Sequence, residues 1–149
     1  MGSEFAKALE LALAKLASAD RFESEIASAL ERKGFSDEIG AVLERLRSRR
    51  LVSDERVAEG VARARSGKRA CGDRSLRAEL TRRGAPAACI DAVLAQLPPE
   101  RERAEAWLAT LKPTLAEPAR VARRLVGRGF SEETIREIVE PLLEAGESL

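Results

Sequence analysis

Three stretches of this chain are versions of one pattern: IASALERKGF (residues 26–35), LRAELTRRGA (residues 76–85) and VARRLVGRGF (residues 121–130). In each, a leucine lies four residues before a glycine, an aliphatic residue eight before it, and a base directly before it. Apolar residues at every fourth position predict a helix with one buried face. The base complements the helix dipole, and glycine accepts the left-handed backbone that ends many helices. Each stretch is therefore predicted to be a helix that stops at its glycine, which is Gly34, Gly84 or Gly129.

A second amphipathic helix is predicted after each glycine. Its apolar residues recur at positions i, i+3, i+4 and i+7, as Ile39, Val42, Leu43 and Leu46, as Ile90, Val93, Leu94 and Leu97, and as Ile135, Ile138, Val139 and Leu142. Ser36 and Ser131 are expected N-caps because acids follow them, and Pro86 suits the first helical position. Phe130 and Ile135 are spaced to form a hydrophobic staple across Ser131.

A less regular helix precedes each pair. Its apolar stripe is Leu9, Ala12, Leu13 and Leu16 in the first copy and Ala104, Trp107, Leu108 and Leu111 in the third. We interpret Trp107 as a core residue because it belongs to that stripe. In the second copy we expect the helix to begin at the cap Ser53, with a staple between Val52 and Val57, and to run towards Arg65.

These helices define three units. The glycines lie 50 and 45 residues apart (84 − 34 and 129 − 84), and Leu97-Pro98-Pro99 closes the second unit because a residue before proline avoids the helical region. We predict units at residues 6–49, 50–98 and 99–149, and we interpret residues 1–5 as a cloning remnant outside the fold. Short units gain stability by stacking. The fold is therefore predicted to be all-α, with three tandem three-helix units stacked as an elongated, curved array.

Composition argues against a membrane protein and against an enzyme. Charged residues make up 34% of the chain, no apolar run reaches the length of a membrane span, and nothing resembles a signal peptide, so we expect a cytoplasmic protein. Histidine, the commonest general base, is absent. Cys71 and Cys89 fit no metal spacing, although bases near Cys71 could lower its thiol pKa, and Cys89 is expected in the core. We therefore predict no catalytic residues, no metal and no cofactor.

The charge is concentrated in the middle of the chain, although the net charge is only +1. Residues 1–44 hold 5 bases and 9 acids, residues 45–83 hold 13 and 5, and residues 84–149 hold 8 and 11. Such a basic cluster attracts phosphate backbones or acidic protein surfaces, and arginine favours bidentate contacts. The alternative is a solvated face whose acids lie on the neighbouring units. No aromatic residue is interleaved with the bases, and the helix over residues 85–97 lacks base-reading side chains, so specific operator recognition is not expected.

The order of these motifs resembles the bacterial RecX regulators. The similar residues are Glu25-Ile26, Leu30 and Lys33-Gly34-Phe35, then Asp54-Glu55-Arg56-Val57-Ala58, Gly72, Leu76, Glu79-Leu80 and Arg83-Gly84, and finally Leu125 and Arg128-Gly129-Phe130. The similarity covers roughly residues 6–142. Val57 stands where the family generally has an aromatic residue, and Ala85 stands where a larger aliphatic residue is usual, which affects the expected packing more than the function.

The resemblance implies a regulator of the recombinase RecA that lies along the groove of the RecA–DNA filament and limits its ATPase and strand-exchange activities. Some members also bind DNA. The bases expected to make this contact are Arg49, Arg50, Arg63, Arg65, Lys68, Arg69, Arg74 and Arg77, extended by Arg82, Arg123 and Arg124. We expect a monomer that binds single- or double-stranded DNA without sequence preference. The alternatives are a helical DNA-binding module with no RecA target and an interaction scaffold whose basic face serves solubility.

Overall fold

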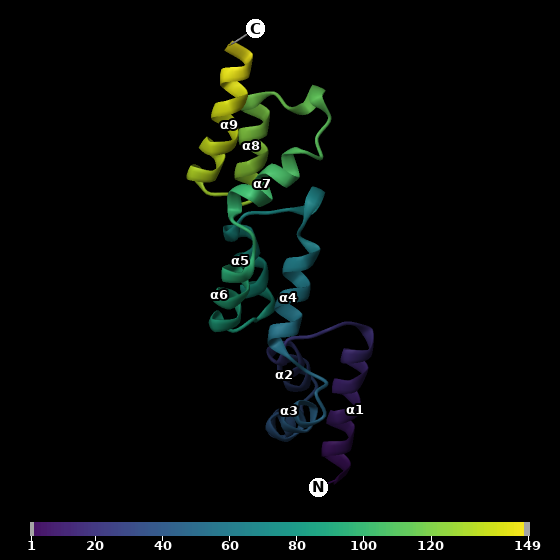
Figure 1. Cartoon of the computed structure of the whole chain (residues 1–149). Coiled ribbons are helices and arrows are strands. Elements are labelled where there is room, and N and C mark those ends of the chain that lie inside the picture. The colour runs from purple at the N-terminus through teal and green to yellow at the C-terminus, as the bar shows by residue number, and fades with distance from the viewer. Residues whose placement is uncertain (1, 148–149) are drawn as a thin grey trace.

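The computed structural model describes residues 2–147, and all regular secondary structure in this part of the chain is helical, with no strand. The α-helices are α1 (Gly2–Ser18), α2 (Glu23–Arg32), α3 (Ile39–Ser48), α4 (Asp54–Ala64), α5 (Asp73–Arg83), α6 (Ala87–Gln96), α7 (Glu100–Leu108), α8 (Pro118–Gly127) and α9 (Glu132–Glu147). Three 3-10 turns join them: η1 (Ser36–Glu38), η2 (Gly67–Arg69) and η3 (Pro113–Leu115). The helices form an elongated stack with the two ends of the chain at opposite ends (Figure 1). The predicted all-α class is confirmed.

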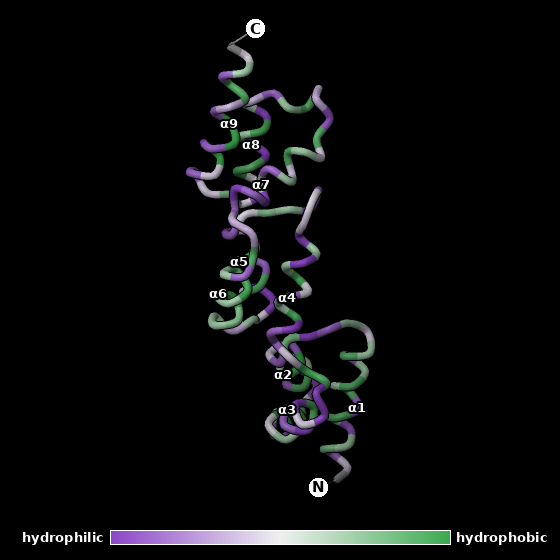
Figure 2. The backbone as a smooth tube through the Cα atoms, viewed as in Figure 1, coloured by the Kyte–Doolittle hydropathy of each residue, from purple (hydrophilic) through white to green (hydrophobic). Residues whose placement is uncertain are grey.

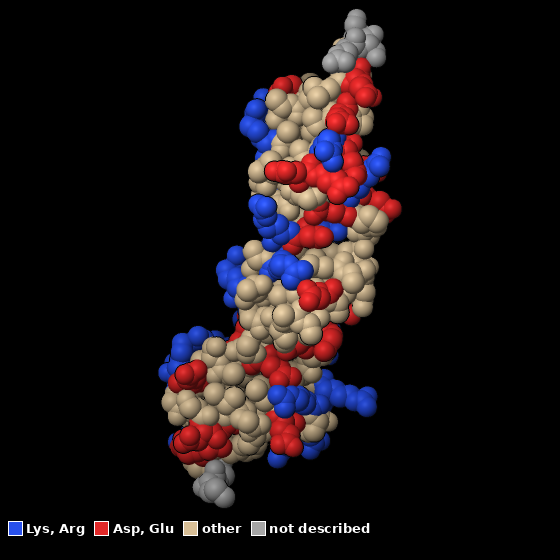
Figure 3. All heavy atoms as spheres, turned by 90° about the vertical axis from the view of Figure 1, so that its left-hand side faces the viewer, with Lys and Arg blue, Asp and Glu red and all other residues tan. Residues whose placement is uncertain are grey.

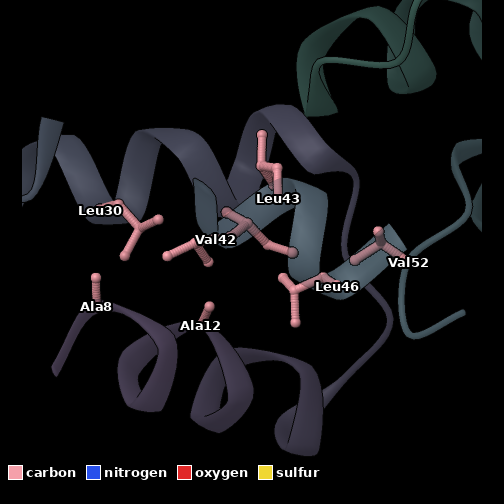
Figure 4. Packing of buried hydrophobic residues seen from close by; sticks show 8 residues of the cluster. Ala8, Ala12, Leu30, Val42, Leu43, Leu46 and Val52 are labelled. Atoms are coloured by element: carbon pink, nitrogen blue, oxygen red, sulfur yellow. The ribbon is translucent and has the colours of Figure 1, made fainter. Parts of the chain in front are cut away.

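Each group of three helices encloses its own core. Leu30, Leu80 and Leu125, the leucines four residues before the three glycines, are all fully buried, one in each core. In the first core, Ala8 and Ala12 of α1 face Leu30 of α2 and the α3 residues (Figure 4). The small alanines let α1 approach closely. Along the helices, hydrophobic and hydrophilic residues alternate (Figure 2), and none of the helices in residues 2–147 is long and apolar enough to cross a membrane.

The three glycine turns share one geometry. Gly34, Gly84 and Gly129 have φ values of 85°, 90° and 80°, so each adopts the predicted left-handed conformation. After each glycine, the next N–H donates back to the buried leucine's carbonyl, at 2.8 Å in the first copy, 3.0 Å in the second and 3.2 Å in the third. This pattern satisfies carbonyls that the helix end leaves without partners.

The helix starts depart from the prediction in two places. The Ser131 and Ser53 hydroxyls accept N–H bonds, as expected of N-caps, but Ser36 begins η1 and caps nothing. Ser36 lies three residues before the apolar residue Ile39, whereas Ser131 lies four residues before Ile135. With one residue fewer, the segment from Ser36 to Glu38 forms the 3-10 turn η1 before α3 begins. Pro86 is the residue before α6 rather than its first residue.

Two packing predictions were also wrong. Val52 and Val57 do not form a staple, because Val52 packs in the first core and Val57 in the second. Leu13 is 41% exposed, because α1 instead turns Phe5, Ala8 and Ala12 towards its neighbours. Residues 2–5, which the sequence suggested were outside the fold, continue α1, and Phe5 packs on the first core.

Each unit docks on the one before it through its glycine turn. The Ser24 hydroxyl donates to the Gly84 carbonyl at 2.7 Å. A Cβ on Gly84 would lie only 2.2 Å from the Ser24 hydroxyl oxygen. At the next junction a Cβ on Gly129 would lie 2.2 Å from the Ser75 hydroxyl oxygen. Gly34 has no such neighbour among the described residues. Glycine at positions 84 and 129 is therefore required both by the backbone and by the approach of the preceding unit.

A carboxylate also crosses each junction. The Asp54 side chain, at the start of α4, accepts the Glu23 N–H at 2.9 Å, so the second unit caps a helix of the first. Glu100, at the start of α7, accepts the Asp73 N–H at 2.9 Å in the same way. Glu100 also accepts the Ser131 N–H at 2.9 Å and the Thr134 hydroxyl, so one carboxylate binds the starts of α5 and α9 together.

The second junction predicts a large effect for Gly72→Ala. Gly72 has ordinary backbone angles, but a Cβ there would lie 2.4 Å from the Gly129 carbonyl carbon and 2.5 Å from the Phe130 Cα. We expect this substitution to lower the free energy of unfolding by about 1–3 kcal/mol through overpacking. Gly60→Ala is the matched control, because Gly60 lies within α4 with nothing near its Cβ position, and it should stabilise by about 0.5–1 kcal/mol. Urea denaturation followed by circular dichroism measures both. Equal stability of the two variants would contradict the close approach.

The Glu100 bridge predicts an acid dependence of stability. Burial alone would raise the Glu100 pKa, but the hydrogen bonds from Thr134, Asp73 and Ser131 outweigh it, so the pKa lies below its ordinary value of 4.5. The stability from ionised Glu100 is therefore present above that value and is lost as the pH falls through the folded-state pKa. Glu100→Gln should lower the free energy of unfolding by about 1–3 kcal/mol at neutral pH. The deficit should shrink below pH 4.5 in thermal melts. Glu102→Gln, with no described partner, should leave the profile unchanged.

Candidate polyanion-binding surface

The bases of the middle segment divide into structural and free side chains. Of the thirteen in residues 45–83, four form ion pairs: Arg47 with Glu23, Arg65 with Glu79, Arg77 with Asp91, and Arg83 with Glu25. The other nine have no acidic partner within residues 2–147. The acids of neighbouring helices therefore neutralise part of the cluster and leave most of it available.

A basic hollow of about 510 Å³ lies where the second unit meets the third, and we call it the central hollow. Its bases are Arg65, Lys68, Arg69, Arg82 and Arg128, and its one acid, Glu79, is already paired with Arg65. The lining residues of α5 are Ser75, Ala78, Glu79 and Arg82, which are spaced i, i+3, i+4 and i+7 and so share one helix face. The hollow therefore offers several cations converging from both units.

A second hollow continues this surface over the third unit, and we call it the distal hollow. It measures about 310 Å³, and its bases are Lys68, Lys112, Arg124 and Arg128, with no acid in its lining. Lys68 and Arg128 line both hollows, so the two form one continuous basic surface. In Figure 3, Lys and Arg recur along one edge of the stack at successive levels, while the acids of the upper unit gather towards the other side.

The structure brings together five of the eleven bases predicted for the site. Arg65, Lys68, Arg69 and Arg82 line the central hollow and Arg124 lines the distal one. The other six lie elsewhere, although all are exposed: Arg49 and Arg50 just after α3, Arg63 at an apolar cleft beside Leu97 and Pro98, Arg74 beside Asp73, Glu100 and Glu133, Arg77 against Asp91, and Arg123 on α8. On α5, Arg74 and Arg77 fall outside the helix face that lines the central hollow.

Arg128 and Lys112 belong to this surface but were not among the predicted site residues. Arg128 was interpreted as a cation at a helix end, yet its guanidinium lies 4.9 Å from the centroid of the Trp107 ring and donates to the Ala70 carbonyl at 2.9 Å. Arg83, at the same place in the second unit, lies 5.2 Å from the centroid of the Phe22 ring and donates to the Asp20 carbonyl at 3.2 Å. Asp20 and Ala70 each precede their own unit's glycine by 14 residues. The sequence did hold a signal for this role, because arginine precedes the glycine in the second and third units, whereas lysine precedes it in the first.

Two arginines of the surface differ in their electrostatics. The hydrogen bond to Glu79 raises the pKa of Arg65 and holds its positive charge in place. Burial, with a further contribution from Arg124, lowers the pKa of Arg128. A partly buried cation beside a like charge gains from an approaching anion, because the anion offsets part of the lost solvation. Arg128 is therefore a side chain that a bound phosphate or carboxylate would stabilise.

Burial raises the thiol pKa of both cysteines and so disfavours the thiolate form. Burial raises the pKa of the Cys71 thiol despite the nearby Arg65, Arg103 and Arg128, so the lowered pKa considered from the sequence was wrong. Cys89 is only half-buried, and it packs beside Glu55 rather than in the core. Within residues 2–147, no three His, Cys, Asp or Glu side chains are placed to hold a metal ion.

These features define a helical-repeat protein with a basic surface along its stacked units. The family description "RecX, first three-helix domain" matches residues 8–46. The regulatory protein RecX of Mycobacterium leprae is 35% identical over 91% of this chain and 85% of the relative, and that of Prosthecochloris aestuarii is 33% identical over 95% and 97%. The chain belongs to the RecX family of regulatory proteins. The crystal structure of RecX from Lactobacillus salivarius, 18% identical, has the same fold with a TM-score of 0.81 over 95% of this chain and 98% of that one.

The role of Arg128 at the junction predicts a difference between equivalent positions. We expect Arg128→Ala to lower the free energy of unfolding by about 1–3 kcal/mol, because it removes a charged hydrogen bond and a ring contact. Lys33→Ala is the control at the same position of the first unit, and it should change stability by less than about 0.5 kcal/mol. Denaturation followed by Trp107 fluorescence and by circular dichroism measures both. A Lys33 effect as large as that of Arg128 would show that the base acts on its own helix and not across the junction.

Proposed function

We propose that this chain regulates the recombinase RecA by lying along the groove of the RecA–DNA filament, and that it thereby limits the ATPase and strand-exchange activities of the filament. The observation that carries this proposal is the continuous basic surface formed by the central and distal hollows, running along a stack of locked units. A partner that repeats its negative charge along a line matches such a surface better than a compact ligand does.

The shape and the charge of the chain support this proposal together. The glycine turns, the arginines and the carboxylates at the junctions hold the three units together as one elongated body. A contact made by one unit therefore positions the next unit. Exposed arginines and lysines without acidic partners gain most from phosphates, which they bind through charge and, in the case of arginine, through bidentate hydrogen bonds. A strut held in a groove would oppose the relative movement of filament subunits that ATP turnover and strand exchange require.

The family supports a regulatory role, because the relatives are named as regulatory proteins. Inhibition of RecA in recombination and DNA repair is the finer step, and it rests on the resemblance together with the basic surface. The alternative is a sequence-independent DNA-binding module without a RecA target, which the same surface would serve. A monomeric state and a cytoplasmic location stay predictions.

The test compares two variants of equal charge. The first replaces Lys68, Arg69, Arg82 and Arg124 with Gln and empties the two hollows of four cations. The control replaces Arg74, Arg77, Arg101 and Arg136 with Gln; three of these lie beside acids and none lines either hollow. We expect the hollow variant to need at least about tenfold more protein for half-inhibition of the DNA-dependent ATPase of RecA, because four phosphate contacts are lost. The control should stay within about threefold of the unchanged chain.

Co-sedimentation with RecA filaments across a salt series separates the alternatives. Stronger binding to filaments than to naked DNA supports the proposal. In the hollow variant, the slope of log K against log salt concentration for filament binding should become shallower by about 3. Tight binding to naked DNA that RecA does not change would favour the DNA-binding module. A flat salt dependence would favour an interaction scaffold. Normal inhibition by the hollow variant, with unchanged helicity, would remove the central and distal hollows from the mechanism.

A further inference from the structure

A third hollow lies at the junction of the first and second units, and we call it the proximal hollow. It measures about 380 Å³ and is bounded by the end of α1, the segment joining α1 to α2, one face of α2 and the end of α5. Its charged lining residues are Lys15, Arg21, Glu25, Arg32, Arg82 and Arg83. Three of these bases lie outside the basic middle segment of the chain, in residues 1–44, where acids outnumber bases: Lys15, Arg21 and Arg32. The distribution of charge along the sequence therefore did not point to them.

The charges that line the proximal hollow are not balanced. Glu25 is its one acid, and this carboxylate accepts a hydrogen bond from Arg83 at 3.0 Å and from the Phe22 N–H at 2.8 Å. Lys15, Arg21, Arg32 and Arg82 form no ion pair within residues 2–147. Four cations with no acid to balance them repel one another across a concave surface, where the field is focused. An anion placed there would relieve that repulsion.

Arg21 gives the lining of the hollow an unsatisfied hydrogen-bond donor. Its Nε is buried and has no hydrogen-bond acceptor among the described residues, while its terminal nitrogen donates to the Ser18 hydroxyl at 3.1 Å. A buried N–H of a charged group without an acceptor has lost its hydration and gained no hydrogen bond in return, so native structures rarely leave one unsatisfied. An anion oxygen that reached this N–H from the hollow would supply the missing acceptor.

We propose that the proximal hollow is a phosphate-binding site in which Lys15, Arg21, Arg32 and Arg82 hold the anion. The hydroxyls of Ser24 and Ser28 also line the hollow, and Ser28 has no described partner. Phosphate fits this set because its oxygens accept from several cations and hydroxyls at once. The volume exceeds that of one phosphate group, so it also admits part of the molecule to which the phosphate is joined. Two sources share this chemistry, the backbone of a nucleic acid and a free phosphate or pyrophosphate.

A phosphate in the proximal hollow would bridge two units. Lys15, Arg21 and Arg32 belong to the first unit and Arg82 to the second, and Arg82 also lines the central hollow. Occupancy would therefore tie the first junction and extend the basic surface over the first unit. The site does not depend on RecA, so it stands apart from the proposed function.

The test follows the side-chain Nε–Hε signal of Arg21 by ¹⁵N NMR in the whole chain at constant ionic strength. Sodium pyrophosphate and a short thymidine oligonucleotide are titrated separately, with chloride as the reference. We expect the Arg21 signal to shift and saturate. Lys15→Gln with Arg32→Gln should weaken the affinity by at least about tenfold while leaving the backbone spectrum folded. Arg120→Gln with Arg136→Gln, which removes two exposed bases of the third unit, should leave the affinity unchanged.

Each outcome of these titrations is decisive. Saturation by both probes supports a phosphate site open to either source. Saturation by the oligonucleotide alone supports a nucleic-acid phosphate, and saturation by pyrophosphate alone supports a free anion. If the Arg21 signal moves with neither probe, or if the Lys15 and Arg32 variant binds as tightly as the unchanged chain, the proposal is overturned. RecA is absent from this experiment, so its failure would leave the ATPase test of the proposed function untouched.

Discussion

The close approach of each glycine turn to the unit before it is the constraint on which the rest of this molecule depends. Gly84 and Gly129 end their helices in the left-handed conformation, and the same positions leave no room for a side chain because Ser24 and Ser75 lie against them. One residue type thus meets a local demand and a long-range one. Because the two demands coincide, helix length, turn geometry and unit spacing are coupled, and the stack has a defined register.

That register also decides where the basic surface lies. The proximal and central hollows are at junctions, and each takes cations from both of the units that meet there: Lys15 and Arg82 at the first, Arg82 and Arg128 at the second. No single unit contains either hollow. The binding surface is therefore a property of the assembled stack, and a change that loosens a junction alters the surface without touching any of its charges.

Local features of the fold could be predicted from the sequence, whereas contacts between units could not. The leucine and glycine offsets predicted the buried residues Leu30, Leu80 and Leu125 because helix periodicity depends on neighbours a few residues away. Ser36 failed because one residue fewer separates it from Ile39. For the site, the count of bases identified the charged segment, but it could not say which bases share one helix face. Arg82 lines the central hollow, whereas Arg74 and Arg77 lie on other faces of α5. Lys112 and Arg21 lie outside the basic segment of the sequence, and only the folded arrangement of the helices places them in the hollows.

Arginine before the glycine does something that lysine at that position could not do. In the second and third units one planar guanidinium donates to a carbonyl of the preceding unit and lies over an aromatic ring, Phe22 for Arg83 and Trp107 for Arg128. A lysine ammonium has no planar face to stack and no rigid fork. Lysine stands at this position in the first unit, as Lys33, whose side chain forms no hydrogen bond to another unit within residues 2–147. The arginines of this chain are therefore of two kinds. Arg83 and Arg128 join units through hydrogen bonds and also line hollows, whereas Arg69, Arg82 and Arg124 line hollows without an acidic partner in residues 2–147 and so supply the charge that is free to bind.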